Sequence, residues 1–170
     1  METLGVNKAV VSKAKVENIN PNIKLECCDW YFGDKENDCD LLKRADVVIN
    51  VSDIYYNGDK VRPLLRKIVL EGIPLIECAG TQLGGYVSII TKNSVELFDR
   101  TTRDLMHLKR LGAEALGGGC QAYKIAMVSA EAINQLALYF SNSRFASIDS
   151  VLYFDIYHHR YSEEDKYSVF

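Results

Sequence analysis

The segment Ala45-Asp-Val-Val-Ile-Asn-Val51 decides the class of fold that this sequence predicts. It is an almost continuous apolar run rich in β-branched residues, a pattern typical of a central parallel strand buried on both faces. The next strand is expected at Ile73–Cys78, which has its proline near the start, where a missing donor is tolerated. Between them, Val61–Glu71 has apolar residues at helical spacing and is followed by Gly72, a natural helix cap.

The rest of the chain continues this alternation. Further helices are expected over Asn7–Asn18, Cys39–Arg44, Thr101–Leu111 and Gln121–Phe140. Further strands are expected at Ile23–Cys27, Tyr86–Ile90 and Val151–Ile156, and the tail from Tyr161 either adds an edge strand or stays loose. Turn-rich loops are expected at Asp53–Asp59 and Gly112–Gly119. The sequence therefore predicts one α/β domain over residues 1–170, with helices on both faces of a layered sheet.

Composition narrows the class of protein. With 48% hydrophobic and 25% charged residues, the chain is typical of a soluble globular protein, and its net charge of −3 gives no broad basic field for nucleic acid or an anionic membrane. No stretch approaches the ~20 apolar residues of a membrane span, and the first residues contain no apolar signal region, so a cytoplasmic location is expected. Five cysteines without a Cys-x-x-Cys pair predict neither a disulfide framework nor a zinc site.

Several segments occur together in a characteristic order. Val11-Ser-Lys-Ala-Lys-Val-Glu17 is followed by Ile19-Asn-Pro21, and then come Asp46–Asp53, Gly72–Ile76, Leu83–Ile90 and, after a long helix, Val151–Asp155. This series resembles the adenylation domain of the ThiF/MoeB/HesA and ubiquitin-activating (E1-like) superfamily. The resemblance covers most of the chain and implies a Rossmann-like sheet that is mostly parallel, with antiparallel additions.

The sequence also departs from the pattern of that superfamily. Members begin with a strand, a Gly-x-Gly-x-x-Gly loop that holds the nucleotide phosphates, and a second strand ending in an acid that engages the ribose. The present sequence starts after those positions, so the N-terminal nucleotide-binding strands are expected to be missing. Its own glycine cluster, Gly117–Gly119, follows no predicted strand. Asn50 replaces the usual acid, and Ile54 stands where an asparagine is usual.

The resemblance nevertheless implies candidate site residues. In the superfamily, ATP and magnesium convert the C-terminal carboxylate of a small carrier protein into an acyl adenylate. Lys15 matches a lysine that steadies phosphate charge, Asp53 an aspartate that helps to hold magnesium, and Arg62 lies within about a residue of a family arginine. The alternatives are a solvated lysine on an amphipathic helix for Lys15, and a turn residue that caps the loop for Asp53.

A thioester-forming cysteine is a further chemical hypothesis. Such a nucleophile needs an exposed and partly ionised thiol. Cys120 follows three glycines and precedes a long predicted helix, whose N-terminus would lower the thiol pKa, so it is the better candidate. Cys78 lies inside a predicted buried strand, where packing is its expected role. A structural or incidental role for Cys120 stays open.

Three functions follow from these observations. The first is a catalytically reduced E1-like subunit whose open sheet edge is covered by a protein partner, as a homo- or hetero-oligomer, and which binds a ubiquitin-like or sulfur-carrier protein. The second is an active ATP-dependent adenylyltransferase whose nucleotide loop is supplied in trans. The third is a stand-alone protein or peptide binding module. The isolated chain is not expected to be an enzyme.

Overall fold

One sheet forms the centre of the computed structural model, which describes residues 4–28, 30–34, 38–52, 54–80, 84–110, 122–155 and 160–165. Its strands are β1 (Val48–Asn50), β2 (Leu75–Gly80), β3 (Gly84–Ile90), β4 (Ser150–Asp155) and β5 (Arg160–Asp165), and they lie side by side in that order. β1 and β2 are parallel, whereas each later pair is antiparallel. The layered α/β class is confirmed, but the balance of strand directions in the described sheet is the reverse of the expected one.

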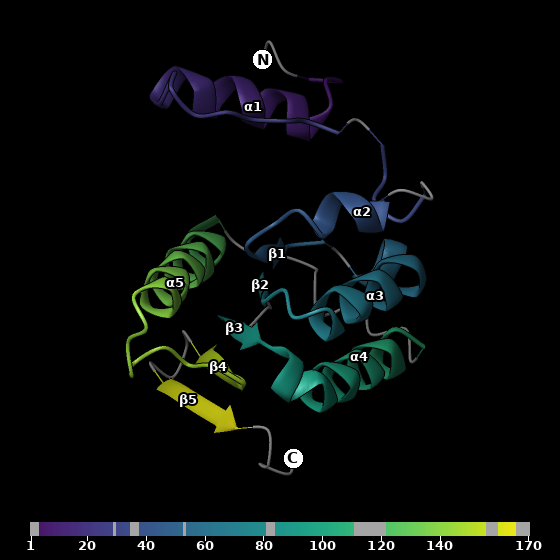
Figure 1. Ribbon diagram of the computed structural model, residues 1–170, viewed down its shortest axis with the longest axis vertical. Helices are drawn as coiled ribbons and strands as arrows, with labels where there is room; N and C mark the ends of the chain where they lie inside the picture. The colour runs from purple at the N-terminus through teal and green to yellow at the C-terminus, as the bar shows by residue number, and fades with distance from the viewer. Residues whose placement is uncertain are drawn as a thin grey trace.

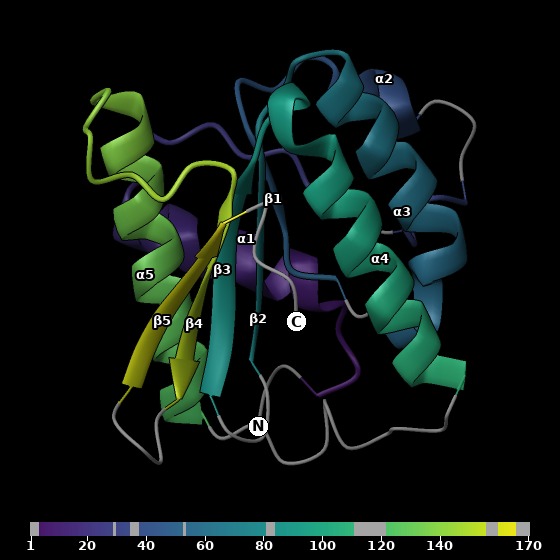
Figure 2. The same cartoon turned by 90° about the horizontal axis from the view of Figure 1, so that it is seen from below.

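Helices cover both faces of this sheet (Figures 1 and 2). α3 (Ile54–Leu70) and α4 (Val95–Arg110) lie on one face, and α5 (Ala122–Phe140) lies on the other. The strands alternate accordingly, so that Leu75 and Ile90 pack with α3 and α4 while Ile76 and Ile89 pack with α5. Two separate apolar clusters therefore hold the layers together.

β1 occupies an edge of the sheet rather than the predicted centre. Val48 is buried, but Ile49 is 42% exposed and Val51 is 75% exposed. An apolar run shows that a strand has apolar surroundings, but it does not show how many neighbours the strand has. The expectation of burial on both faces is therefore wrong.

The sheet face that carries α5 is closely fitted to that helix at a glycine. A Cβ atom added at Gly85 would lie 2.2 Å from Cγ2 of Val128 on α5 and 2.7 Å from the carbonyl oxygen of Ala79. Glycine at this position therefore sets how closely α5 approaches β3. At the end of α3, Gly72 has φ +94°, which confirms its predicted role as the helix cap.

A polar cluster around Asp149, which we call the Asp149 clip, joins the end of β3 to the start of β4. Oδ1 of Asp149 accepts hydrogen bonds from the backbone N–H of Thr91 at 3.1 Å and from its hydroxyl at 2.9 Å, and it also accepts one from the hydroxyl of Ser94. Thr91 and Ser94 form a capping box at a 3₁₀ turn, Lys92–Ser94, that leads directly into α4. The clip thus lies at the end of the sheet opposite the carboxyl ends of β1 and β2.

The first helix lies apart from these layers, whereas the second packs against α3 and the sheet through the buried Cys39. α1 (Lys8–Ile19) has no buried residue and sits beyond the β1 edge, and α2 (Asp38–Leu42) follows it (Figure 1). The predicted strand at Ile23–Cys27 is wrong, because residues 23–28 have no regular structure. An alternating pattern becomes a strand only where a neighbouring strand accepts its hydrogen bonds.

Helix boundaries differ from the expected ones at two places. The predicted loop Asp53–Asp59 is helical from Ile54 onwards, and α4 begins at Val95 rather than at Thr101. The predicted short helix near Cys39 and the long helix ending at Phe140 are confirmed, and the tail supplies an edge strand, β5. The predicted loop Gly112–Gly119 lies outside the described residues. None of the helices in the described ranges is long and apolar enough to cross a membrane.

Candidate functional site

A largely buried polar network joins the carboxyl end of β1 to the middle of β2. Asn50, the last residue of β1, is in register with Glu77 of β2, and its side-chain amide donates a 3.0 Å hydrogen bond to Oε1 of Glu77. Oδ1 of the Asn50 side chain accepts hydrogen bonds from the backbone N–H of Ser52 at 3.1 Å and from the Ser52 hydroxyl at 2.6 Å. The turn that follows β1 is therefore tied through Asn50 to the middle of β2.

Arg62 of α3 completes this network. Its side chain is 5% exposed and forms an ion pair with Oε1 of Glu77, which is 1% exposed. Nε of Arg62 donates a 2.8 Å hydrogen bond to the hydroxyl of Thr102 on α4, and the guanidinium carbon lies 3.9 Å from the centre of the Phe98 ring. The positive charge of Arg62 is thus compensated inside the protein, between α3, α4 and the sheet.

One atom of the network has no partner among the described residues. Oε2 of Glu77 is buried and accepts no hydrogen bond there. The carboxylate is therefore stabilised through Oε1 alone, by Arg62 and Asn50. This makes the network dependent on each of those two donors.

Two ionisable groups near Glu77 are kept neutral. Burial raises the pKa of Tyr86 above its ordinary value, and the negative charge of Glu77 adds to this. Burial, followed by the charge of Glu77, also raises the pKa of the Cys78 thiol. Cys78 packs against the apolar cluster on the α5 side. A neutral, packed thiol is a poor nucleophile, which supports the interpretation of Cys78 as a packing residue.

The raised pKa of Tyr86 predicts a loss of stability in alkali. The pKa of Tyr86 is higher in the folded chain than in the unfolded chain. At pH values between these two pKa values, the unfolded chain has lost the Tyr86 proton and the folded chain retains it. The free energy of unfolding therefore falls as pH rises above about 10. We expect Tyr86→Phe to unfold at a less pH-dependent temperature than the parent between about pH 9 and 11. Thermal unfolding followed by circular dichroism measures this. Equal pH slopes for the two proteins would contradict the prediction.

The predicted site residues do not come together in the described structure. Lys15 is exposed on α1, beyond the β1 edge, whereas Arg62 is buried on α3 (Figure 1). No described hydrogen bond or ion pair joins these two side chains. Asp53 and Cys120 lie outside the described residues. The functional roles of all four residues therefore stay predictions.

Sequence reasoning missed Asn50, Glu77 and Thr102 as members of a common network. The available signal was Glu77 itself, an acid within the otherwise apolar segment Leu75–Ala79. A buried carboxylate needs a buried cation or several donors. The structure supplies this cation from Arg62, on the helix that precedes the strand.

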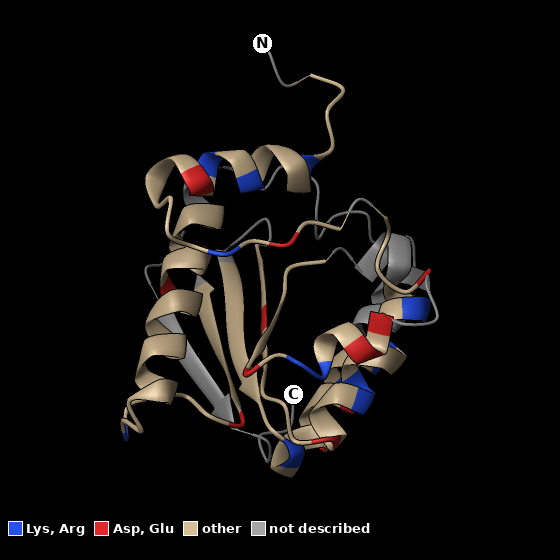
Figure 3. Ribbon diagram, turned by 45° about the horizontal axis from the view of Figure 1, so that its top comes forward, with Lys and Arg blue, Asp and Glu red and all other residues tan. Residues whose placement is uncertain are grey.

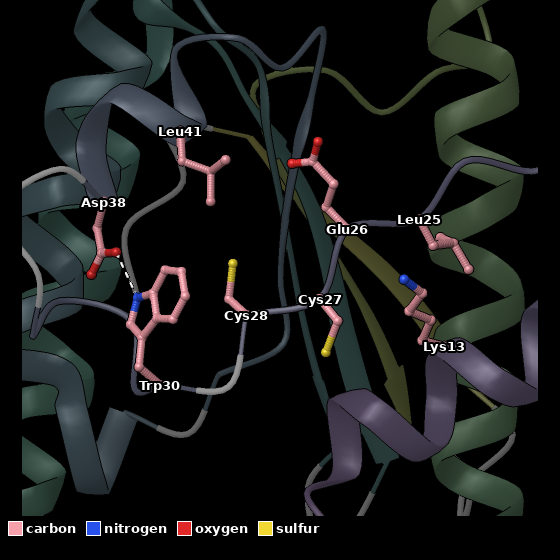
Figure 4. Close-up of a pocket in the computed structure, with 8 residues that line it drawn as sticks. All are labelled: Lys13, Leu25, Glu26, Cys27, Cys28, Trp30, Asp38 and Leu41. Atoms are coloured by element: carbon pink, nitrogen blue, oxygen red, sulfur yellow. Dashed lines mark hydrogen bonds between the residues drawn. The ribbon is translucent and has the colours of Figure 1, made fainter.

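A separate open cavity of about 590 Å³ lies between α1, α2 and the segment that joins them (Figure 4). Nε1 of Trp30 donates a 2.9 Å hydrogen bond to Oδ1 of the buried Asp38, whose Oδ2 accepts one from the backbone N–H of Gly33 at 2.7 Å. Cys27 and Cys28 also line the cavity, but their sulfur atoms point in different directions (Figure 4). Among the described residues, no group of three or more His, Cys, Asp or Glu side chains is placed to hold a metal ion.

Comparison with known proteins agrees with this architecture. The crystal structure of selenomethionine PaaA superposes with a TM-score of 0.67 at 15% identity, covering 98% of this chain and 57% of that chain. At this identity the likeness shows the fold alone, and the present chain spans little more than half of PaaA. No curated protein matches the sequence. The family model of the ThiF family matches residues 1–163, so the resemblance is confirmed and this chain belongs to the ThiF family.

Proposed function

We propose that this ThiF-family chain is a catalytically reduced E1-like subunit. It works together with another adenylating subunit or a second copy of itself, and it does not activate a carboxylate alone. A ubiquitin-like or sulfur-carrier protein is the proposed ligand of the assembled complex, which the membership of the family supports.

The observation that carries this proposal is the position of Arg62. The carboxyl ends of parallel strands are where α/β sheets bind ligands, and a triphosphate bound there needs uncompensated donors and cations. Arg62 is linked through Glu77 to Asn50 at the carboxyl end of β1, but its guanidinium is buried and is held by Glu77, Thr102 and the Phe98 ring. These contacts support a structural role for Arg62 rather than contact with a phosphate.

The sequence supports the same conclusion. No Gly-x-Gly-x-x-Gly occurs in the 170 residues, so these residues supply no loop of that kind to surround a phosphate with backbone N–H groups. This supports the proposal that the chain does not hold ATP alone. Asp53, the proposed magnesium ligand, would have to act together with groups from a partner.

The open edge of β1 supports the need for a partner. β1 pairs with β2 on one side, and no described strand pairs with it on the other. Ile49 and Val51 are exposed there, beside backbone groups that an additional strand or a covering surface would satisfy. A protein partner at this edge would remove an aggregation hazard.

A second candidate function is an adenylyltransferase completed in trans. The exposure of Lys15 favours it, because a solvent-facing lysine on α1 is available to a nucleotide held by another subunit. A stand-alone binding module is the third candidate. All three differ in whether and when pyrophosphate exchange occurs.

ATP–pyrophosphate exchange tests the proposal. We expect the purified chain alone, with magnesium and a carrier protein, to exchange no label above a protein-free control, because its described cations do not converge. We expect Lys15→Ala and Asp53→Ala to leave that result unchanged. Exchange by the chain alone that disappears in Asp53→Ala would overturn the proposal.

The same assay, run after addition of a complete ThiF-family enzyme, separates the first two candidates. Under the proposal, Lys15→Ala leaves the exchange rate of the mixture unchanged, as does the matched substitution Lys24→Ala. A lower rate with Lys15→Ala, but not with Lys24→Ala, would favour adenylation in trans.

A further inference from the structure

We propose that Cys27 and Cys28 form a modification site, a pair of neighbouring thiols that hydrogen peroxide oxidises reversibly to a disulfide. The pair lies in the segment that joins α1 to α2, and both side chains line the open cavity of about 590 Å³. The inference goes beyond the proposed function, since it involves none of the residues considered for adenylation.

Accessibility separates this pair from the other described cysteines. Cys27 and Cys28 are half-buried and line the cavity, whereas Cys39 is only 7% exposed and packs in the core. Cys78 packs against the apolar cluster on the α5 side, and its raised pKa keeps the thiol neutral. Within the described ranges, the neighbouring pair is therefore the place where two thiols together are accessible to an oxidant.

The backbone around the pair leaves the two sulfur atoms free to approach each other. In a strand, successive side chains would lie on opposite faces and stay apart. Residues 23–28 instead have no regular structure, and no described backbone hydrogen bond involves residues 24–28. The sulfur atoms of the free cysteines point in different directions (Figure 4). Rotation of the side chains and of the peptide unit between them brings the sulfur atoms together without breaking a strand or a helix.

The approach to the cavity is polar. Figure 3 shows both signs of charge along α1 and the segment that follows it. Lys13 and Glu26 line the cavity, and Lys24 is exposed beside it in sequence. A small polar oxidant such as hydrogen peroxide therefore reaches the two thiols without crossing an apolar surface.

The oxidation balances with one molecule of hydrogen peroxide. The thiolate of one cysteine attacks a peroxide oxygen, so that the O–O bond breaks, an S–O bond forms and the other oxygen takes up protons and leaves as water. The second thiol then attacks the sulfur of this sulfenic acid, which forms the S–S bond, breaks the S–O bond and releases the second oxygen as water. The thiols together lose two electrons and two protons, and the peroxide is reduced to water.

The adjacency of the two cysteines makes the disulfide easy to reduce. Successive Cα atoms lie about 3.8 Å apart, whereas disulfides usually join Cα atoms that are roughly 4.4–6.8 Å apart. A disulfide closed at the shorter separation is strained, and strained or exposed disulfides are the readily reduced ones. The pair is therefore suited to a reversible modification and not to permanent stabilisation of the fold.

Peptide mapping of the oxidised full chain tests this inference. After brief treatment with hydrogen peroxide and digestion with trypsin, the peptide Leu25–Lys35 contains Cys27 and Cys28 but no other cysteine. We expect this single peptide to be about 2 Da lighter than its reduced form, and its labelling by iodoacetamide to fall about tenfold. Treatment with dithiothreitol should restore both the mass and the labelling.

Trp30 gives a second readout, because it is the only tryptophan of the chain and lines the same cavity. Its indole is held by a 2.9 Å hydrogen bond to Asp38, so closure of the nearby disulfide should change its surroundings and shift its fluorescence emission reversibly. We expect Cys27→Ser and Cys28→Ser each to abolish the loss of mass and the fluorescence shift. The matched control is Cys78→Ala, which removes a thiol outside the pair and should preserve both.

Circular dichroism shows whether each variant retains the fold, and the mass measurement on the parent chain tests the inference even where a variant does not. Treatment that leaves the peptide Leu25–Lys35 unchanged, that adds oxygen to its sulfur atoms without closing a bond between them, or that links it to another peptide would contradict the inference. Each of these results is separate from the outcome of pyrophosphate exchange, which tests the proposed function.

Discussion

Replacement of Arg62 by alanine should lower the free energy of unfolding by about 3–5 kcal/mol, because it leaves the carboxylate of Glu77 buried without its cation. Glu77 is 1% exposed, and its second oxygen has no hydrogen-bond donor among the described residues. After the substitution, the Asn50 amide would be the remaining described donor to this carboxylate. Equilibrium unfolding in urea, followed by circular dichroism, measures the change.

A double variant shows whether the loss of stability in Arg62→Ala comes from the uncompensated charge of Glu77. Arg62→Leu combined with Glu77→Leu removes both charges and retains apolar volume, so we expect it to be considerably more stable than Arg62→Ala. If the double variant is at least as unstable as Arg62→Ala, packing by the Arg62 side chain, and not its charge, explains the loss.

Replacement of Phe98 by alanine should also cost about 3–5 kcal/mol, since it empties a position in the cluster between the sheet and helices α3 and α4. Phe98 is 1% exposed, and its ring lies against the Arg62 guanidinium at 3.9 Å. The substitution therefore removes a cation–π contact in addition to apolar contacts. Urea unfolding of the variant gives the magnitude.

Phe140→Ala is the matched control for this prediction. Phe140 is 55% exposed at the end of α5, and its main aromatic contact is an edge-to-face pair with Tyr139. We expect Phe140→Ala to lower the free energy of unfolding by about 1 kcal/mol. Similar losses for the two substitutions would contradict the assignment of Phe98 to the core.

The sequence correctly predicted the elements whose local sequence pattern matches their packing in the structure. The strand expected at Ile73–Cys78 is present as β2 (Leu75–Gly80), which starts just after the proline and follows a helix capped by Gly72 as expected. The long apolar segment of α5 was equally informative. The confirmed family membership also shows that several weak segments in one order carry more information than any of them alone.

Other elements depend on contacts that are distant in sequence. Asn57 and Gly58 are turn-forming residues, yet they are helical in α3, and Gly58 is buried. The turn preference of these two residues predicted a loop, whereas the packing of the helix determines the structure. The prediction of a strand at Ile23–Cys27 is wrong because no described strand pairs with this segment.

The candidate site was predicted only in part. Arg62 was named only from its match to a family arginine, and its ion pair with Glu77 depends on the way that α3 places one helix residue over the adjacent strand. The Asn50–Glu77 contact depends on the register of β1 with β2. Neither relation is visible in residue spacing, which explains why the ion pair was not predicted from the sequence.

The Asp149 clip has a consequence for how motion is distributed in this domain. One carboxylate oxygen holds the end of β3, the first turn before α4 and the start of β4, so opening any one of them breaks hydrogen bonds of the others. Amide protons around the clip should therefore exchange with solvent only through large-scale unfolding. Slow motions that leave the clip intact are therefore expected at the opposite end, where the two parallel strands finish.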